Sequence, residues 1–223
     1  FKHLLDEVAL KHGLNVVCMA KPLAHTPGSS MHIHQSVVEQ GSGLNVFSDE
    51  TGQPTAMFRH FIGGQQACMA DFTALFAPNV NSYQRLCHPY ASPNNACWSL
   101  DNRSAGLRIP ASAPVARRVE NRLPGADANP YLAIAASLAA GLHGIEHKLA
   151  PTPAIQGQFE VPDALLLPCT LHAALERLKR SGLAIELFGT EFIEGYIASK
   201  TLELTSFYDE ITPWERRVLA AQA

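Results

Sequence analysis

Two histidines separated by one residue are the first side chains in the sequence that could share a ligand. His32 and His34 lie in residues 31–37, where apolar and polar residues alternate. Alternation with a period of two is typical of a β-strand, in which both histidines project from the same face. Such a pair is a frequent arrangement for binding a metal ion or a phosphate. Two histidines bonded only to backbone or water are the other interpretation of this pair.

A second stretch with the same period carries charge. Residues 118–122 place Arg118, Glu120 and Arg122 on one face of a predicted strand. Burying two arginines and a glutamate is costly unless they have partners. This face is therefore either solvated or lines a polar cleft in which anions meet a cation.

Arginine is concentrated in this part of the chain. Within the twenty residues 103–122 lie Arg103, Arg108, Arg117, Arg118 and Arg122. Arginine suits bidentate binding of carboxylates and phosphates, so this density predicts an anionic ligand. His32 and Glu120 would add a nitrogen and an oxygen donor, which suit Mg²⁺ or Mn²⁺ if further carboxylates are present. The sequence contains neither of the glycine-rich phosphate-loop patterns, so a nucleotide would be bound in another way.

The elements that must position these side chains follow from periodicity and from helix and turn signals. Asn129 followed by Pro130 is a helix start, and Gly63 with Gly64 weakens the helix in which they lie. Helices are predicted at 1–13, 56–77 and 129–147. Strands are predicted at 14–20, 31–37, 97–110 and 115–123. We expect a long ordered loop at 78–93, and helices after 147 apart from the proline-rich 151–168.

Composition narrows the class of partner. The 223 residues include 17 Lys+Arg and 20 Asp+Glu, for a formal net charge of -3. No run of five or more basic or acidic residues is present, so nucleic acid and membrane surfaces are not expected partners. The most apolar stretch, 131–145, is shorter than the ~20 residues that a bilayer span needs. We expect a cytoplasmic protein without a transmembrane helix.

Cysteine usage agrees with a reducing compartment. The number of cysteines is odd and no C-x-x-C spacing occurs, which favours neither a disulfide framework nor a zinc ribbon. The prediction is that all of them are buried free thiols: Cys18, Cys68, Cys87, Cys97 and Cys169.

Five motifs lie in order along the chain after Lys21 and Pro22. They are GSSMHIHQS at 28–36, NSYQRL at 81–86, NRSAGLRIP at 102–110, RVENR at 118–122 and ANPYL at 128–132. In order and spacing they resemble the glutamine synthetase family, and the match covers nearly the whole chain. The resemblance implies an α+β fold in which a curved antiparallel sheet lines the active site and helices lie outside.

The resemblance also implies a role for each matching residue. The ligands of the divalent ion, Mg²⁺ or Mn²⁺, would be His32 and Glu120. The substrate glutamate would be bound by Gly28, Arg85 and Arg122. The phosphates of ATP would be bound by His34, Ser36, Arg103 and Arg108, the two arginines also acting in catalysis on the transferred phosphoryl group. The implied reaction is ATP-dependent: a γ-carboxylate is phosphorylated and an amine displaces the phosphate.

Two departures from the family pattern concern the acceptor. Pro27 stands where glutamine-forming members usually have Asn, and Ala91 stands where they have a Glu credited with binding ammonium. These changes resemble the γ-glutamylpolyamine synthetase branch, so the predicted acceptor is a primary amine with a carbon chain. A glutamine synthetase that uses ammonia is the alternative.

Other readings concern completeness and activity. Residues 1–223 match the C-terminal portion of the catalytic domain, so we expect an N-terminal β-grasp domain and further metal carboxylates outside this chain, and no activity from the segment alone. A catalytically inert family member and an iron oxygenase of the cupin type are the remaining alternatives. The predominance of helical patterns disfavours the cupin. By analogy, we expect a homo-oligomer built as a double ring.

Overall fold

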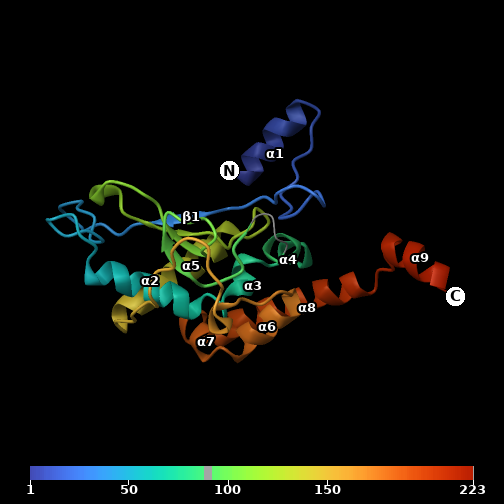
Figure 1. Cartoon of the computed structure of the whole chain (residues 1–223). Helices are drawn as coiled ribbons and strands as arrows, with labels where there is room; N and C mark the ends of the chain where they lie inside the picture. The colour runs from blue at the N-terminus through green and yellow to red at the C-terminus, as the bar shows by residue number, and fades with distance from the viewer. Residues whose placement is uncertain (88–91, 223) are drawn as a thin grey trace.

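The polypeptide forms a small β-sheet with helices packed around it (Figure 1). The computed structural model describes residues 1–87 and 92–222. Its strands are β1 (Ile33–Gln35), β2 (Trp98–Leu100), β3 (Leu107–Ile109) and β4 (Val119–Asn121). Its α-helices are α1 (Lys2–Lys11), α2 (Ala56–Cys68), α3 (Thr73–Phe76), α4 (Val80–Leu86), α5 (Pro130–Glu146), α6 (Leu171–Arg180), α7 (Gly182–Phe188), α8 (Thr190–Tyr208) and α9 (Pro213–Leu219). Short 3-10 turns occur at Pro114–Ala116, Asp163–Leu165 and Ala220–Gln222.

The strands form one sheet in the order β1-β4-β3-β2. Strand β4 is antiparallel to both neighbours, but β2 and β3 are parallel. The sheet is therefore mixed, although an antiparallel sheet was expected. Residues 101–106 run back to the edge of the sheet at which β2 begins, so β3 starts there and runs in the same direction as β2. The register places His34 opposite Glu120 and Glu120 opposite Arg108. Directly opposed residues share a face, so these three side chains line one side of the sheet.

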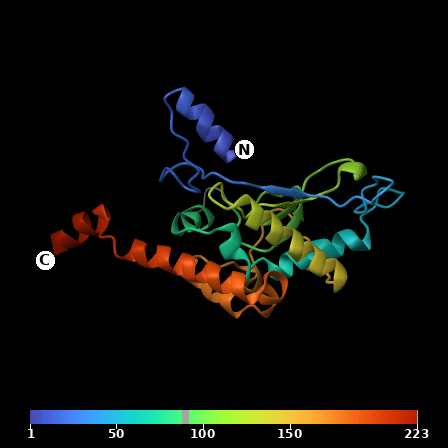
Figure 2. The ribbon, with the colours of Figure 1, turned by 180° about the vertical axis from the view of Figure 1, so that it is seen from behind.

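The other face of the sheet packs against α2 and α5. Figure 2 shows α5 lying across this face. Ile33, Leu107 and Val119 are buried there. A polar pair is buried with them: Ser137 Oγ on α5 donates to Gln35 Oε1 at 2.6 Å. The alternation predicted for 31–37 is confirmed, because Ile33 faces the core while its histidine neighbours face away.

Helices α2 and α5 touch through their backbones. A Cβ atom on Gly64 would lie 2.1 Å from the carbonyl oxygen of Ala140, and one on Gly144 would lie 2.5 Å from the Cα of Gly64. Any larger side chain would separate the helices, so the glycines permit the close approach. The capping prediction for α5 is confirmed, since Asn129 Oδ1 accepts from the amides of Tyr131 (3.0 Å) and Leu132 (3.4 Å).

Three predicted elements were wrong. Residues 14–20 form no strand, and Leu14 and Val17 are 63% and 59% exposed, because no described strand pairs with this segment. The helix predicted at 56–77 ends at Cys68, and α3 starts, after a turn, at Thr73, whose Oγ1 donates to the carbonyl of Met69 (2.9 Å). The loop predicted at 78–93 contains α4.

Strand lengths also differ from prediction. The segment 97–110 holds two short strands with a turn between them, and 115–123 holds a 3-10 turn followed by β4. Helix α1 and the helices after 147 are confirmed. Figure 1 shows α1 and α9 standing off the body of the molecule at opposite ends of the chain. Among residues 1–87 and 92–222, no helix combines the length and apolar character needed to cross a membrane.

Candidate active site

Glu120, in the centre of β4, is surrounded by basic side chains from neighbouring strands. Its Oε2 accepts a hydrogen bond from Arg108 Nη1 at 2.7 Å, and its Oε1 accepts one from Arg122 Nη1 at 2.7 Å. The Nδ1 of His32 lies 3.0 Å from Oε1, and the Nε2 of His34 lies 3.9 Å from the same oxygen. The structure thus brings together five of the predicted site residues, which we call the Glu120 cluster.

The exposed fraction of the side chains in the Glu120 cluster increases from Glu120 to the histidines. The side chains of Glu120 and Arg122 are 3% and 8% exposed, and that of Arg108 is 16% exposed. The imidazoles of His32 and His34 are 28% and 42% exposed. A ligand would therefore reach the cluster from the histidine side.

Opposing effects set the charge of Glu120. Burial acts to raise the pKa of its carboxyl, but the Arg108 hydrogen bond and the charges of Arg122 and Arg108 outweigh burial, so the pKa lies below its ordinary value. A buried carboxylate that keeps its charge needs such partners. Glu120 is therefore ionised at neutral pH.

Both histidines are held neutral. Burial, assisted by the charge of Arg122 and opposed by Glu120, lowers the pKa of His32 to about 4. Burial also lowers the pKa of His34, against the opposing charge of Glu120 and with the help of Arg118. A neutral imidazole carries a lone pair on one ring nitrogen, which can bind a metal ion or accept a hydrogen bond.

Arg118 determines the tautomer of His34. Its Nε donates to His34 Nδ1 at 3.1 Å, and its Nη1 donates to the carbonyl of Ala116 at 3.1 Å. Because Nδ1 accepts this bond, the proton of the neutral ring is on Nε2, the atom nearer Glu120. The predicted charged face of 118–122 is therefore a bonded network.

Arg108 is held between two carboxylates. Besides Glu120, it bonds Asp101 Oδ1 through Nε at 3.1 Å and through Nη2. Asp101 has φ 48°, in the left-handed region that Asp tolerates better than most residues. Sequence reasoning missed Asp101, although a carboxylate one residue beyond β2 was the available signal.

Arg85 and Gly28 form a second part of the site. Arg85 is 1% exposed and donates to Ser30 Oγ (3.0 Å), Ser92 Oγ (2.6 Å) and the carbonyl of Leu123. Burial lowers its pKa to about 10. A Cβ on Gly28 would lie 2.6 Å from Arg85 Cγ, so this contact requires glycine. The two predicted glutamate-side residues are thus neighbours.

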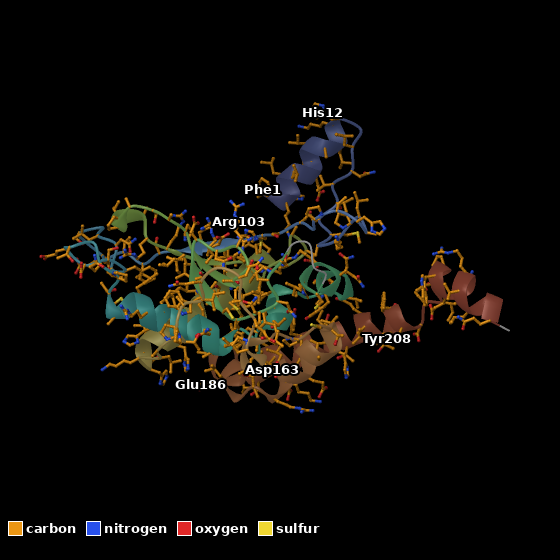
Figure 3. The ribbon with its side chains drawn as sticks, in the orientation of Figure 1. Phe1, His12, Arg103, Asp163, Glu186 and Tyr208 are labelled. Carbon is orange, nitrogen blue, oxygen red and sulfur yellow. The ribbon has the colours of Figure 1, made fainter. Side chains whose placement is uncertain are left out.

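Arg103 and Ser36 lie outside the Glu120 cluster. Both are exposed, and neither donates a side-chain hydrogen bond to the described residues. Figure 3 shows Arg103 on the side of the molecule opposite Glu186. Its charge nevertheless adds to the influences that lower the pKa of Arg122, after burial and Arg108.

Two aromatic side chains have packing contacts. Tyr83 is buried, and Trp98 donates its indole N–H to the carbonyl of Thr152 at 2.6 Å. Tyr90 and Ala91 lie outside the described residues.

Asp127 positions the helix that carries Arg85. Its Oδ2 accepts from Ser82 Oγ (2.5 Å) and Asn79 Nδ2 (2.9 Å), the two residues that cap the start of α4. Sequence reasoning missed this residue. The cap pair of Asn79 and Ser82 was the signal that α4 begins there.

The donors present fit part of a divalent-ion site. Adjacent ligands of an octahedral ion at about 2.1 Å are about 3 Å apart, and His32 Nδ1 and Glu120 Oε1 are separated by 3.0 Å. Within residues 1–87 and 92–222, no group of three His, Cys, Asp or Glu side chains is arranged to hold a metal ion. His32 and Glu120 would therefore supply a minority of the donors.

Comparison with known proteins shows which family the chain belongs to. The model of the glutamine synthetase catalytic domain matches residues 1–219. Over 96% of its length, the chain is 38% identical to a glutamate–isopropylamine ligase from Pseudomonas sp and 36% identical to gamma-glutamylputrescine synthetase PuuA of Escherichia coli. It is also 38% identical, over 96% of its length, to a glutamine synthetase from Thermus thermophilus.

A solved structure described as apo GmaS without ligand superposes on 98% of the chain, with a TM-score of 0.85 and 34% identity. The chain spans about half of that protein, and 48%, 45% and 50% of the three relatives above. The extent of the family match and these identities show that the chain belongs to the glutamine synthetase family, whose catalytic-domain fold it shares.

Proposed function

We propose that the protein containing this chain is an ATP-dependent ligase that joins an amine to the γ-carboxylate of glutamate through a γ-glutamyl phosphate. The observation that carries the proposal is the Glu120 cluster, in which an ionised carboxylate and two neutral imidazoles lie beside arginines. This combination suits a reaction between anions that a divalent ion must bring together. Its place in metabolism would be amine or polyamine utilisation.

The proposed metal ligands are His32 and Glu120, for Mg²⁺ or Mn²⁺. When bound, the ion would neutralise phosphate charge during transfer. The ionised Glu120 and the neutral His32 are both in the form that binds a cation. Because these two residues leave most positions of the ion unfilled, we propose that the isolated segment has no ligase activity.

The proposed phosphate-binding residues include two members of the Glu120 cluster, His34 and Arg108, and two exposed residues outside it. Arg108 would exchange a carboxylate partner for the transferred phosphoryl group, since its guanidinium is bonded to Asp101 and Glu120 in this structure. The nucleotide phosphates would be bound by His34, Ser36, Arg103 and Arg108. The exposed position of Arg103 leaves its guanidinium free to reach a phosphate from solvent.

The proposed glutamate-binding residues are Gly28, Arg85 and Arg122. Arg85 Nε and Arg122 Nε are both buried without a hydrogen-bond partner in the described part of the chain. An unpaired buried N–H of this kind is costly and is relieved when a carboxylate accepts from it. Both arginines therefore retain a donor for a substrate carboxylate.

For the acceptor, we propose a primary amine with a carbon chain. Pro27 and Ala91 remove an amide and a carboxylate that would hold and deprotonate ammonium. A longer amine recovers binding free energy from buried methylenes, at about 0.8 kcal/mol each. Two relatives named above are amine ligases by their descriptions. Ammonia is the second candidate, favoured by the similarity to the Thermus glutamine synthetase.

The test is phosphate release by the full-length protein with ATP, glutamate and one acceptor at a time. The panel would contain ammonia, putrescine, spermidine, ethanolamine and short alkylamines. We expect at least one amine to give a higher kcat/KM than ammonia, and Ala91→Glu to shift preference towards ammonia. If ammonia equals or exceeds every amine, the protein is a glutamine synthetase. If no acceptor supports phosphate release, it is an inert member of the family.

A further inference from the structure

Two cysteines 82 positions apart in the sequence meet at the protein surface. Cys87 Sγ donates a hydrogen bond to the carbonyl oxygen of Cys169 at 3.6 Å, which places the two residues in direct contact. Both residues are exposed, whereas Cys68 and Cys97 are buried and Cys18 is half-buried. The prediction of five buried thiols is therefore wrong for this pair, because cysteine counting along a chain says nothing about contacts between distant segments.

Asn94 contacts the pair from the other side. Its Nδ2 donates to Cys169 Sγ at 2.9 Å and to the carbonyl of Leu167 at 3.3 Å. This amide N–H lies beside the Cys169 sulfur, where it can stabilise negative charge on that atom during a nucleophilic attack. Within residues 1–87 and 92–222, no side chain donates to the Cys87 sulfur, and desolvation of that sulfur together with the neighbouring Cys169 side chain raises the pKa of Cys87 to about 12. Cys169 is therefore the thiol suited to react first.

We propose that Cys87 and Cys169 are an oxidant-sensitive pair that closes to an intramolecular disulfide. The oxidant is a peroxide: the Cys169 thiolate attacks one peroxide oxygen, the O–O bond breaks, and water leaves after protonation. The sulfenic acid on Cys169 then condenses with the Cys87 thiol, forming the S–S bond and releasing a second water. Two thiols are oxidised and one H2O2 is reduced, so atoms and electrons balance.

The remaining cysteines cannot take part in the same way. Cys68 and Cys97 have no exposed surface, so a peroxide does not reach their sulfurs in the folded protein. Burial raises the pKa of Cys68 to about 12 and also raises that of Cys97. The bond would join the C-terminal end of α4 to the residue before the N-cap of α6.

The test is peptide mapping of the full-length protein after treatment with hydrogen peroxide and alkylation of free thiols under native conditions. Trypsin leaves Cys87 and Cys97 in one peptide, 86–103, and places Cys169 in 149–177. We expect a dithiothreitol-sensitive cross-link between these peptides, within one chain on a non-reducing gel. It should persist in Cys97→Ala and disappear in Cys87→Ser and Cys169→Ser.

A second readout tests the order of reaction. In Cys87→Ser the resolving thiol is missing, so dimedone should trap a sulfenic acid on Cys169, whereas in Cys169→Ser Cys87 should stay reduced. A cross-link that survives Cys87→Ser, a disulfide only between chains, or two thiols that both remain alkylatable after peroxide would overturn the proposal. The readout is a covalent bond, so none of these outcomes depends on ligase activity.

Discussion

The charge balance around Glu120 explains why so many basic side chains are tolerated at little exposure. Arg108 and Arg122 share the single carboxylate of Glu120, and Asp101 supplies the second anion. The histidines add no charge, because both pKa values are lowered. Each arginine therefore has an ionised partner, and the cluster depends on Glu120 more than on any other member.

Replacing Glu120 by Gln should destabilise the fold strongly. The substitution leaves Arg122 buried without its anion and leaves Arg108 with Asp101 alone, and breaking a buried ion pair costs about 3–5 kcal/mol. Urea unfolding would measure the loss. The matched control is Glu176→Gln, which breaks the exposed pair with Arg180 and should cost less than about 1 kcal/mol. Equal losses for both variants would contradict the buried-pair interpretation.

Arg108→Ala should reduce turnover of the full-length enzyme by about 10²-fold or more, because a charge stabiliser acts mainly as the phosphoryl group transfers. The KM for glutamate should change little. Arg177→Ala removes an exposed arginine bonded to Asp71 and should leave both constants unchanged. Unchanged turnover with a raised KM for glutamate would move Arg108 into the substrate-binding group.

At the scale of elements, partly buried polar contacts help to position the helices α4 and α8. Helix α4 is held through Asp127, which bonds both capping residues. Helix α8 is tied to α3 by Tyr196, whose hydroxyl donates to the carbonyl of Ala74 at 2.7 Å. Because α4 carries Arg85, the first of these contacts also orients a proposed substrate residue.

Asp127→Ala should loosen α4. Loss of the acceptor leaves Asn79 and Ser82 without their partner, at a cost of about 1–3 kcal/mol. The KM for glutamate should rise more than kcat falls, because Arg85 loses its fixed position. Asp163→Ala, at an exposed 3-10 turn, is the control and should change neither quantity. A stability loss with an unchanged KM would limit Asp127 to a structural role.

Two buried tyrosines predict alkaline instability. Burial raises the pKa of both Tyr83 and Tyr196. A raised folded-state pKa contributes stability that is fully present below the unfolded value, near 10, and is lost as pH rises beyond it. The free energy of unfolding should therefore fall above pH ~10, and Tyr196→Phe and Tyr83→Phe should each flatten that fall.

The same two variants should differ at neutral pH. Tyr196→Phe loses a hydrogen bond and should cost about 1 kcal/mol. The Tyr83 hydroxyl is buried without a partner among the described residues, so Tyr83→Phe should be neutral or stabilising. Tyr131→Phe, at an exposed position, is the control for both measurements. A large loss for Tyr83→Phe would show that its hydroxyl has a partner.

At the scale of the whole molecule, the surface is larger than a compact monomer needs. The chain exposes 12999 Å², whereas area scaling with mass gives about 10,000 Å² for 24.2 kDa. The excess is consistent with the projecting ends in Figure 1. Large apolar side chains are exposed there, among them Leu4 on α1 and Phe207, Tyr208, Ile211 and Trp214 around the start of α9.

We therefore propose that the full-length protein is a homo-oligomer. We expect sedimentation to give a mass of at least twice that of one full-length chain. Trp214→Ala should shift the equilibrium towards smaller species, because an indole supplies large apolar contact area. Val115→Ala, at another exposed apolar side chain, is the control. A monomer at micromolar concentration would contradict this proposal.

The sequence by itself determined the features that depend on near neighbours in the chain. The period of two placed His32 with His34, and Arg118 with Glu120, each pair on one face. Asn129 and Pro130 marked the start of α5, and the ordered motifs identified the family. Local composition gave a wrong prediction in two places. At 78–93, the Asn and Ser that indicated a loop cap α4. At 14–20, the apolar run that indicated a strand has no described strand beside it.

Only the tertiary structure decided which of these faces meet. The strand register sets Glu120 between His34 and Arg108. The contacts that join Asp127 to α4 and Cys87 to Cys169 link segments 45 and 82 residues apart. Periodicity along one strand carries no information about its partner's register, because pairing is settled by burial of the opposite face and by the turns between strands. For that reason the residue types of the site were predictable, while the pairing within it was not.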